Sequence, residues 1–233
     1  MRIDGDLVEA RFLTRDNRFR VTVEADEGPV WAHLPNSGRL EELLVSGHRV
    51  LLVRRSAPHR KTRYDLSLVQ LAGQWVSVDA RLPNDLVEEA LVAGRLAPFV
   101  GYPDVSREVV FGRSRLDLLL EARGRPACLI EVKSATLVID GLACFPDAVT
   151  LRGRRHLREL ATATERGYRA AAVFVVQRGD AIGLRPYDES DPEFGQVLRD
   201  VASRGVEVYA YACSVEPGRV EITRSLPLHS IWT

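Results

Sequence analysis

Apolar and polar side chains alternate with a period of two over the first 80 residues, which is typical of β-strands. Turn-forming pairs such as Asp16-Asn17 and Ser46-Gly47 separate the alternating segments, and a short helical turn is expected near Leu40–Leu44. Five or six short strands in this length favour a small β-barrel, and an oligonucleotide-binding (OB) barrel and a small barrel of another kind both fit the pattern. The predicted strands cover Leu7–Leu13, Arg18–Glu24, Val30–Leu34, His48–Arg54, Tyr64–Leu71 and Gln74–Val78.

The pattern changes after Leu82-Pro83, where apolar residues begin to recur at helical spacing. Asn84 is a suitable N-cap for a helix over Asp85–Ala93, and Gly94 is a suitable stop. The run Arg169–Val176 lacks alternation, as does a strand covered on both faces. We therefore predict an α+β or α/β chain, with a barrel in residues 1–82 and a mixed α/β domain in residues 83–233. Its other expected elements are strands at Val105–Phe111, Arg115–Leu120, Ala127–Val132 and Val206–Ala212, and helices at Thr150–Arg166 and Pro192–Val201.

Composition narrows the possible functions. The 32 basic and 32 acidic side chains sum to zero, with a pI near 7.0, whereas a globally basic nucleic-acid binder has a pI above about 9. A nucleic-acid function would therefore depend on local basic patches. Three scattered cysteines, the lack of a signal peptide and the lack of any apolar run of 18 residues predict a cytoplasmic protein that does not enter a membrane.

Two carboxylates and a lysine form the sharpest candidate site. Asp117 lies inside the apolar run Leu116–Leu120, and Glu131 and Lys133 share one face of the next predicted strand. If these strands pair as a hairpin, Asp117 comes beside Glu131, and the two carboxylates with the backbone carbonyl of Val132 would suit Mg²⁺. The alternative is an ordinary half-exposed strand, which shows the same charged–apolar–charged pattern.

The lysine carries further information because 30 of the 32 basic residues are arginine. Only Lys61 and Lys133 are lysines. Arginine also neutralises phosphate but, with a pKa above about 12, it takes no part in proton transfer. A lysine that positions or helps to deprotonate an attacking water therefore explains the residue type at position 133.

Two basic segments are candidate nucleic-acid contacts. No acidic residue occurs between Leu43 and Tyr64, so the basic residues there are expected to form an uncompensated patch or, alternatively, a flexible basic loop around residues 56–59. The helix at Thr150–Arg166 is expected to turn Leu151, Leu157 and Leu160 to the core and its basic face to phosphates or simply to solvent. The candidate contacts are Arg49, Arg54, Arg55, Arg60, Lys61, Arg63, Arg152, Arg155 and His156.

Other polar residues are candidates for supporting roles. Asn36 and Arg39 lie in a turn-prone stretch that can offer donors to an anion or can simply precede the turn at Leu40. Glu88, on the predicted helix at Asp85–Ala93, is a candidate outer carboxylate of the metal site or an ordinary solvent-exposed residue.

The chain resembles the sugar fermentation stimulation protein A (SfsA) family over essentially its whole length. The resemblance implies an OB barrel followed by a PD-(D/E)XK nuclease-like domain, DNA binding, and an association with the regulation of sugar, notably maltose, utilisation. It implies that Asp117, Glu131 and Lys133 are the motif residues, and it points to Asp147 for phosphate or substrate positioning. The segments that carry it are Leu34–Arg39 (LPNSGR), Pro83–Leu86 (PNDL), Ser114–Asp117 (SRLD), Glu131–Leu137 (EVKSATL), Phe145–Leu157 (FPDAVTLRGRRHL) and Gly205–Val208 (GVEV).

Three functions remain open from the sequence. The first is a nuclease that depends on Mg²⁺ or Mn²⁺ and hydrolyses phosphodiester bonds, most favourably in DNA. The second is a non-catalytic DNA-binding regulator on a nuclease-like fold. The third is a protein- or metabolite-binding module, and a homodimer is compatible with all three.

Overall fold

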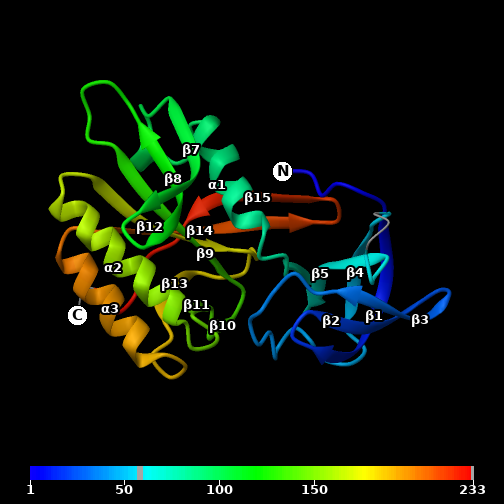
Figure 1. The fold of residues 1–233 in the computed structure, drawn as a ribbon. Helices are drawn as coiled ribbons and strands as arrows, with labels where there is room; N and C mark the ends of the chain where they lie inside the picture. Colours follow the sequence, from blue (N-terminus) through cyan, green and yellow to red (C-terminus); the bar gives the residue numbers. More distant parts are fainter. Residues whose placement is uncertain (57–59, 232–233) are drawn as a thin grey trace.

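The N-terminal third of the computed structural model, which describes residues 1–56 and 60–231, is a closed β-barrel (Figure 1). Its sheet has the order β3-β2-β1-β4-β5-β6, and an additional pairing of β3 with β5 closes it. The closed circuit β1-β2-β3-β5-β4 is that of an OB fold, so the predicted OB barrel is confirmed. The strands are β1 (Leu7–Asn17), β2 (Arg20–Ala25), β3 (Gly28–His33), β4 (Arg49–Arg54), β5 (Tyr64–Leu71) and β6 (Gln74–Ser77).

The alternation that predicted these strands fills the barrel, but two strands depart from it. Val21 and Val23 of β2 are fully buried in the barrel core, as period-two patterning requires. β4 and β5 are instead buried on both faces, because Leu51 and Leu68 turn outward into the core of the second domain. The barrel is therefore packed against that domain through β4 and β5.

The second domain is built on a six-stranded sheet of order β15-β14-β12-β9-β8-β7. β12 runs parallel to β9 and β14, and the other neighbours are antiparallel. Its elements are α1 (Leu82–Val92), a short 3₁₀ helix (Ala97–Phe99), β7 (Asp104–Phe111), β8 (Ser114–Glu121), β9 (Cys128–Ala135), α2 (Leu151–Glu165), β12 (Arg169–Val176), α3 (Pro192–Ser203), β14 (Glu207–Glu216) and β15 (Arg219–Ser225).

Helices cover both faces of this sheet (Figure 1). In β12, Ala170, Ala172 and Phe174 pack with α2 and α3, while Ala171 and Val173 pack with α1. Coverage on both faces explains why the sequence of β12 is continuously apolar. The predicted mixed α/β domain is thus confirmed.

Several short elements were not predicted from the sequence. A small sheet of β10 (Val138–Ile139), β11 (Leu142–Phe145) and β13 (Gly183–Pro186) lies beside α2, and strands of two to four residues contain too few positions to show a period. β15 was also missed. Residues 1–3 lie along it, with the Ile3 amide donating to the Gly218 carbonyl at 2.9 Å.

Within residues 1–56 and 60–231, no helix is long and apolar enough to cross a membrane.

Two predictions about the helices were wrong. The N-cap of α1 is Arg81, without a side-chain hydrogen bond, so Asn84 lies inside the first turn and its amide is free to reach β8. Leu151 is 72% exposed and is not part of the apolar stripe of α2, which contains the buried Leu157 and Leu160. The reason is that α2 begins at Leu151 itself, with Thr150 capping Gly153 at 3.0 Å.

The core of the second domain yields a stability prediction. Phe174 is fully buried, and Phe145 packs edge-on against both Phe174 and Phe194, at 5.4 and 5.2 Å between ring centroids. Phe174→Ala should lower the free energy of unfolding in urea by about 3–5 kcal/mol. Phe19→Ala, at a side chain that is 47% exposed, is the matched control and should change it by less than about 0.5 kcal/mol. Equal effects would show that the Phe174 core does not hold this domain together.

Candidate active site

The candidate site lies where β8 and β9 stop pairing. Their ladder runs from Leu120↔Cys128 to Leu118↔Ile130, so continuing the register would place Asp117 opposite Glu131. At this point the Val132 amide donates to the Asp117 carboxylate, at 2.8 Å, and not to a backbone carbonyl of β8. The other Asp117 oxygen accepts the Asn84 side-chain amide at 2.9 Å, which fixes the carboxylate against α1.

Glu131 is the centre of the site. It is 4% exposed, and its Oε1 accepts hydrogen bonds from Lys133 Nζ and His156 Nδ1. Its Oε2 is buried and has no hydrogen-bond partner among the described residues. A buried carboxylate oxygen without a donor is an energetically unfavourable arrangement that a cation would relieve.

The two carboxylates differ in acidity. Burial raises the pKa of Asp117, and the nearby negative charge of Glu131 raises it further. Burial alone would also raise the pKa of Glu131, but Lys133 and His156 outweigh it and hold that pKa below its ordinary value. Glu131 is therefore ionised at neutral pH. The repulsion between the two carboxylates mainly disfavours the ionised form of Asp117.

These groups fit a small divalent cation. The donors are the Asp117 carboxylate, the free Oε2 of Glu131 and the backbone carbonyl of Val132. In a strand the N–H and C=O of one residue point to the same side, so the Val132 carbonyl is directed toward Asp117 like its amide. Within the described parts of the chain, no group of three or more His, Cys, Asp or Glu side chains is arranged to hold a metal ion by itself. A site with two carboxylates suits Mg²⁺, which keeps several of its waters.

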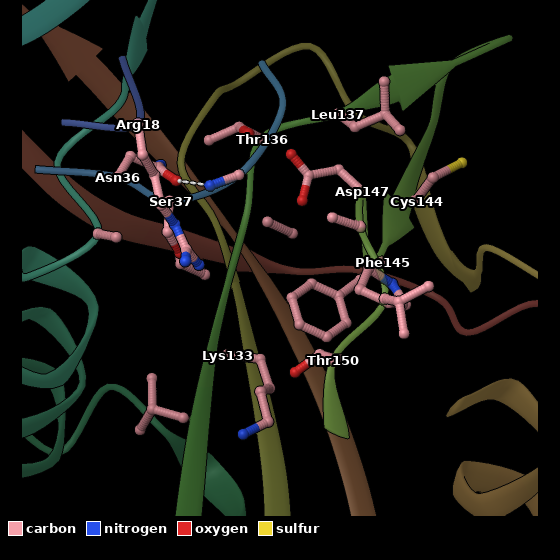
Figure 2. Close-up of a pocket in the computed structure, with 18 residues that line it drawn as sticks. Arg18, Asn36, Ser37, Lys133, Thr136, Leu137, Cys144, Phe145, Asp147 and Thr150 are labelled. Carbon is pink, nitrogen blue, oxygen red and sulfur yellow. Dashed lines mark hydrogen bonds between the residues drawn. The ribbon is translucent and has the colours of Figure 1, made fainter. Parts of the chain in front are cut away.

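A cavity of about 280 Å³ opens beside Lys133, between the barrel and the second domain (Figure 2). The barrel contributes Arg18 and the loop 36–38, and the second domain contributes Lys133, Ser134, Thr136, Asp147 and Thr150. Lys133 itself is 8% exposed. The cavity is at the lower limit of small-molecule sites, which span about 300–1,000 Å³, so its size suits one phosphodiester group better than a large ligand.

The loop that forms one wall of this cavity is fixed from both sides. The Asn36 amide donates to the Val78 carbonyl at 3.0 Å, and its Oδ1 accepts the Gly38 amide at 2.8 Å. Asp147 Oδ2 accepts the Arg39 amide at 2.8 Å. The expectation that this loop offers free donors to an anion, with Asp147 positioning phosphate, is corrected here. The Arg39 amide is occupied by Asp147, whose negative charge instead locks the loop onto the second domain.

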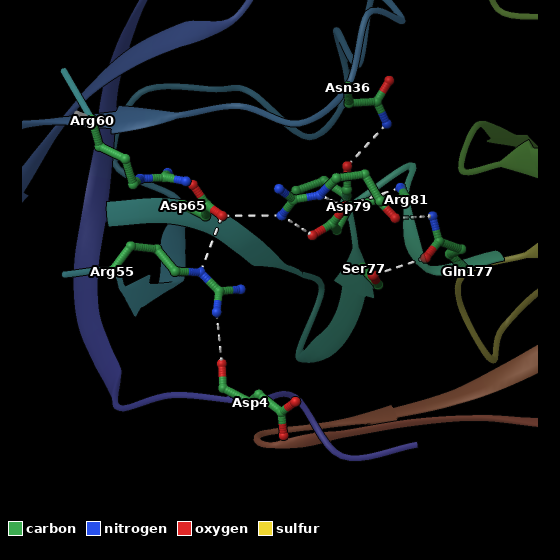
Figure 3. Close-up of polar contacts among 10 residues, drawn as sticks. Asp4, Asn36, Arg55, Arg60, Asp65, Ser77, Asp79, Arg81 and Gln177 are labelled. Carbon is green, nitrogen blue, oxygen red and sulfur yellow. Dashed lines mark hydrogen bonds and ion pairs between the residues drawn. The ribbon is translucent and has the colours of Figure 1, made fainter. Parts of the chain in front are cut away.

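The predicted uncompensated patch in the barrel was wrong for three of its six residues. Arg55 and Arg60 both bind the buried Asp65, together with Arg81 (Figure 3). Arg49 pairs with Glu9 at 3.0 Å. Asp65 lies just beyond the acid-free stretch, and antiparallel pairing of β4 with β5 brings it back beside Arg55. Arg54 lies over the Tyr64 ring at 5.4 Å.

Three basic side chains of that patch remain available. Arg54, Lys61 and Arg63 are exposed and make no ion pair with any residue that the structure describes. The alternative of a flexible loop falls partly on residues 57–59, which lie outside the described residues.

On α2, the structure separates the predicted basic face. Arg152 and Arg155 are exposed, as a phosphate-contacting role requires, and that role stays a prediction. His156 is only 2% exposed, so its predicted place on the outer face was wrong: it points inward to Glu131, and its Nε2 lies 3.4 Å from Arg152 Nε.

Glu88 was expected as an outer carboxylate, but it pairs with Arg107 at 3.1 Å. The α1 residue that reaches the site is Asn84, one turn earlier. The sequence signal for this role of Asn84 was its place in the PNDL segment. Composition and hydrophobic period alone do not distinguish such an asparagine from one that caps a helix.

Comparison with known proteins identifies the family. The model of the "Sugar fermentation stimulation protein RE domain" matches residues 81–219, and that of the "SfsA N-terminal OB domain" matches residues 13–78. The chain belongs to the SfsA family. The sugar fermentation stimulation protein homolog of Moorella thermoacetica is 49% identical over 221 residues, covering 94% of this chain and 95% of the relative. That of Syntrophotalea carbinolica is 46% identical over 230 residues, covering 98% and 99%.

A solved SfsA structure shares the whole architecture. SfsA of Pyrococcus furiosus in complex with Ca²⁺ superposes with a TM-score of 0.91 at 30% identity, covering 98% of each chain. Barrel and second domain therefore have the same arrangement in an SfsA family member of 30% identity.

The raised pKa of Asp117 generates a pH-dependence prediction for the metal-free protein. A carboxyl whose pKa is raised on folding lowers the free energy of unfolding as pH rises from its ordinary pKa, about 3.9, through the raised one. Asp117→Asn should abolish this slope, because Asn84 can turn its amide to pair with the new side chain. The variant should be more stable than the wild type at pH 7 and equal to it near pH 4, measured by urea unfolding with chelator.

Asp104→Asn, at an exposed aspartate that begins β7, is the control and should leave the pH profile unchanged. A metal-free Asp117→Asn protein that is less stable than the wild type at pH 7 would contradict the electrostatic account of this pair.

Proposed function

We propose that this chain is a divalent-metal-dependent nuclease that hydrolyses phosphodiester bonds, with DNA as the favoured substrate. The observation that carries the proposal is the meeting of Asp117, Glu131 and Lys133 at the divergence of β8 and β9, with a buried oxygen of Glu131 left unpaired. The Ca²⁺ complex of P. furiosus SfsA supports the use of a divalent cation.

In this proposal the three residues are those of a PD-(D/E)XK motif. Mg²⁺ or Mn²⁺ would be held by Asp117, Glu131 Oε2 and the Val132 carbonyl. The bound cation would lower the pKa of a coordinated water and neutralise negative charge on the phosphate. Asn84 and the Val132 amide keep the Asp117 carboxylate oriented. His156 binds the same Glu131 oxygen as Lys133, Oε1, and so fixes the carboxylate while leaving Oε2 without a hydrogen bond.

Lys133 is the residue that acts on water and phosphate. Its ammonium lies at the cavity wall, bonded to Glu131, where it positions a water for in-line attack and stabilises negative charge on phosphate oxygens. The exposed Arg39, Arg54, Lys61, Arg63, Arg152 and Arg155 contact the sugar–phosphate backbone and set affinity rather than rate.

The second candidate is a non-catalytic DNA-binding regulator, with the link to sugar and maltose utilisation that the family implies. One observation favours it. Lys133 and His156 already bind Glu131 Oε1, so these buried groups stabilise one another and have a structural role that requires no catalysis. This candidate predicts binding that depends strongly on salt but not on metal or on Lys133.

Lys133→Ala separates the two candidates. Loss of the ammonium should lower the rate of Mg²⁺- or Mn²⁺-dependent cleavage at least about 100-fold and leave DNA affinity within about twofold. The assay measures cleavage of labelled single-stranded, duplex and branched DNA and, in parallel, binding by fluorescence anisotropy. Lys61→Ala, at the other lysine of the chain, is the control and should cleave at the wild-type maximal rate.

Absence of cleavage from every substrate with either metal would overturn the nuclease proposal. Salt-dependent binding that survives chelator and Lys133→Ala would then support the regulator. Failure to bind any nucleic acid at low salt would overturn both.

Metal binding can be tested without activity. A cation that binds only the folded state raises the melting temperature with its concentration. Mn²⁺ or Ca²⁺ should stabilise the wild type in this way, whereas Glu131→Gln should lose at least about tenfold in affinity because an amide is a weaker ligand than a carboxylate. Glu88→Gln is the matched control on α1, since Glu88 binds Arg107 rather than the site. An unchanged Glu131→Gln titration would contradict the proposed ligand set.

A further inference from the structure

Two large aromatic side chains are exposed next to each other on the barrel. Trp31 of β3 is 55% exposed, and Phe19, in the turn between β1 and β2, is 47% exposed. The Phe19 and His33 rings lie 6.4 Å apart between centroids. A hollow on the barrel surface is lined by Phe19, Arg20, Trp31, His33, Lys61 and Thr62. Exposed aromatics that line a hollow need an explanation that scattered surface apolar residues do not.

Trp31 lines two hollows on the barrel surface. A second hollow beside the first is also lined by Trp31, with Lys61, Arg63 and Tyr64. Arg20 lies over the Trp31 ring at 4.4 Å, and Arg18 lies 5.4 Å from the Phe19 ring centroid. Arg20 also pairs with Asp16, at 3.1 Å. None of the described residues that line either hollow is acidic, so these aromatic faces lie in a positively charged surround.

Alternating aromatic faces and basic side chains are the chemistry that binds single-stranded nucleic acid, because bases stack on the rings and phosphates approach the cations. A duplex offers its bases for stacking only at its ends, whereas an unpaired strand exposes every base. A peptide would need both acidic and flat side chains at the right spacing to match this surface, whereas every nucleotide of an unpaired strand carries a phosphate and a base.

The same two segments of the barrel line both the aromatic hollow and the cavity at Lys133. The turn Asn17–Arg20 contributes Phe19 and Arg20 to the hollow and Arg18 to the cavity. Likewise, His33 lines the hollow while the loop 36–38 lines the cavity. The Arg15 guanidinium holds the two segments together, donating to the carbonyls of Gly38 and Arg39 at 2.8 Å and of Arg18 at 2.9 Å. The two sites are therefore built on neighbouring residues of two cross-linked segments.

We infer that Phe19 and Trp31 form a stacking platform for single-stranded nucleic acid, and that the substrate class of the proposed nuclease is nucleic acid with an unpaired segment. The claim about the substrate class rests on the proposed nuclease function, whereas the stacking platform does not. A strand stacked on Phe19 and Trp31 passes over the Arg18 turn, so that one of its phosphodiesters enters the cavity beside Lys133. Lys61 and Arg63 contact its phosphates on the far side of Trp31.

The test measures binding by the full-length protein in chelator, so that no cleavage occurs. The probes are a labelled oligo(dT) strand, a blunt duplex, and the same duplex with an unpaired tail, compared by fluorescence anisotropy. Wild type should bind the strand and the tailed duplex at least about tenfold more tightly than the blunt duplex. Trp31→Ala and Phe19→Ala should each weaken strand binding about tenfold, while Trp31→Phe retains most of the affinity because a ring remains.

The matched control is Tyr168→Ala, at an aromatic side chain of the second domain that is 39% exposed and should not matter. Strand affinity that is unaffected by both Trp31→Ala and Phe19→Ala, with circular dichroism unchanged, would overturn the platform, as would equal affinity for strand and blunt duplex.

Cleavage separates this inference from the proposed function. Platform-dependent strand binding without cleavage by any metal would retain the stacking platform and overturn the nuclease. Metal-dependent cleavage of blunt duplex at the rate of the tailed duplex, unchanged in Trp31→Ala, would retain the nuclease and overturn the inferred substrate class.

Discussion

The buried negative charge of Glu131 constrains much of the second domain. A carboxylate that is 4% exposed is tolerated only with positive or hydrogen-bonding partners around it. Lys133 supplies one from the same strand, and His156 supplies the other from α2, which docks its Leu157 and Leu160 on the sheet at the same time. Both partners approach Oε1 and leave Oε2 unsatisfied. The packing of α2 and the readiness of the site for a cation are therefore two consequences of one charge.

The second constraint is the fixed position of the barrel. β4 and β5 turn Leu51 and Leu68 into the core beneath α1, so the barrel shares its outer face with the second domain. Polar contacts align the same interface: Gln177 at the end of β12 bonds Ser77, Ser134 and the Asp79 carbonyl (Figure 3 shows the first and last). These apolar and polar contacts connect the two domains, and the cavity at Lys133 is lined by residues of both.

Most of the fold was predictable from local patterns. The strands of the barrel were found because period-two alternation marks a strand that is buried on one face. β12 was found because a continuously apolar run marks a strand that is buried on both faces. The Asp191 cap of α3 was found because an aspartate before a proline is a local signal. Predictions failed where a residue's role depends on a distant partner. Asn84 fits a cap equally well, but α1 starts earlier and leaves its amide for Asp117. Arg55 and Arg60 have no acidic neighbour in sequence, yet strand pairing gives them Asp65.

The sequence by itself determined the two-part architecture, the family, and the trio Asp117, Glu131 and Lys133, because hydrophobic period and short motifs are local properties. Only the tertiary structure decided which groups surround that trio and which surface leads to it. The inward turn of His156, the buried oxygen of Glu131 that lacks a partner, and the cross-link that Arg15 makes between the turn at Arg18 and the loop at Gly38 all arise from segments apart in the chain. Contacts of that kind depend on how sheets, helices and barrel pack, and no local pattern of residues encodes them.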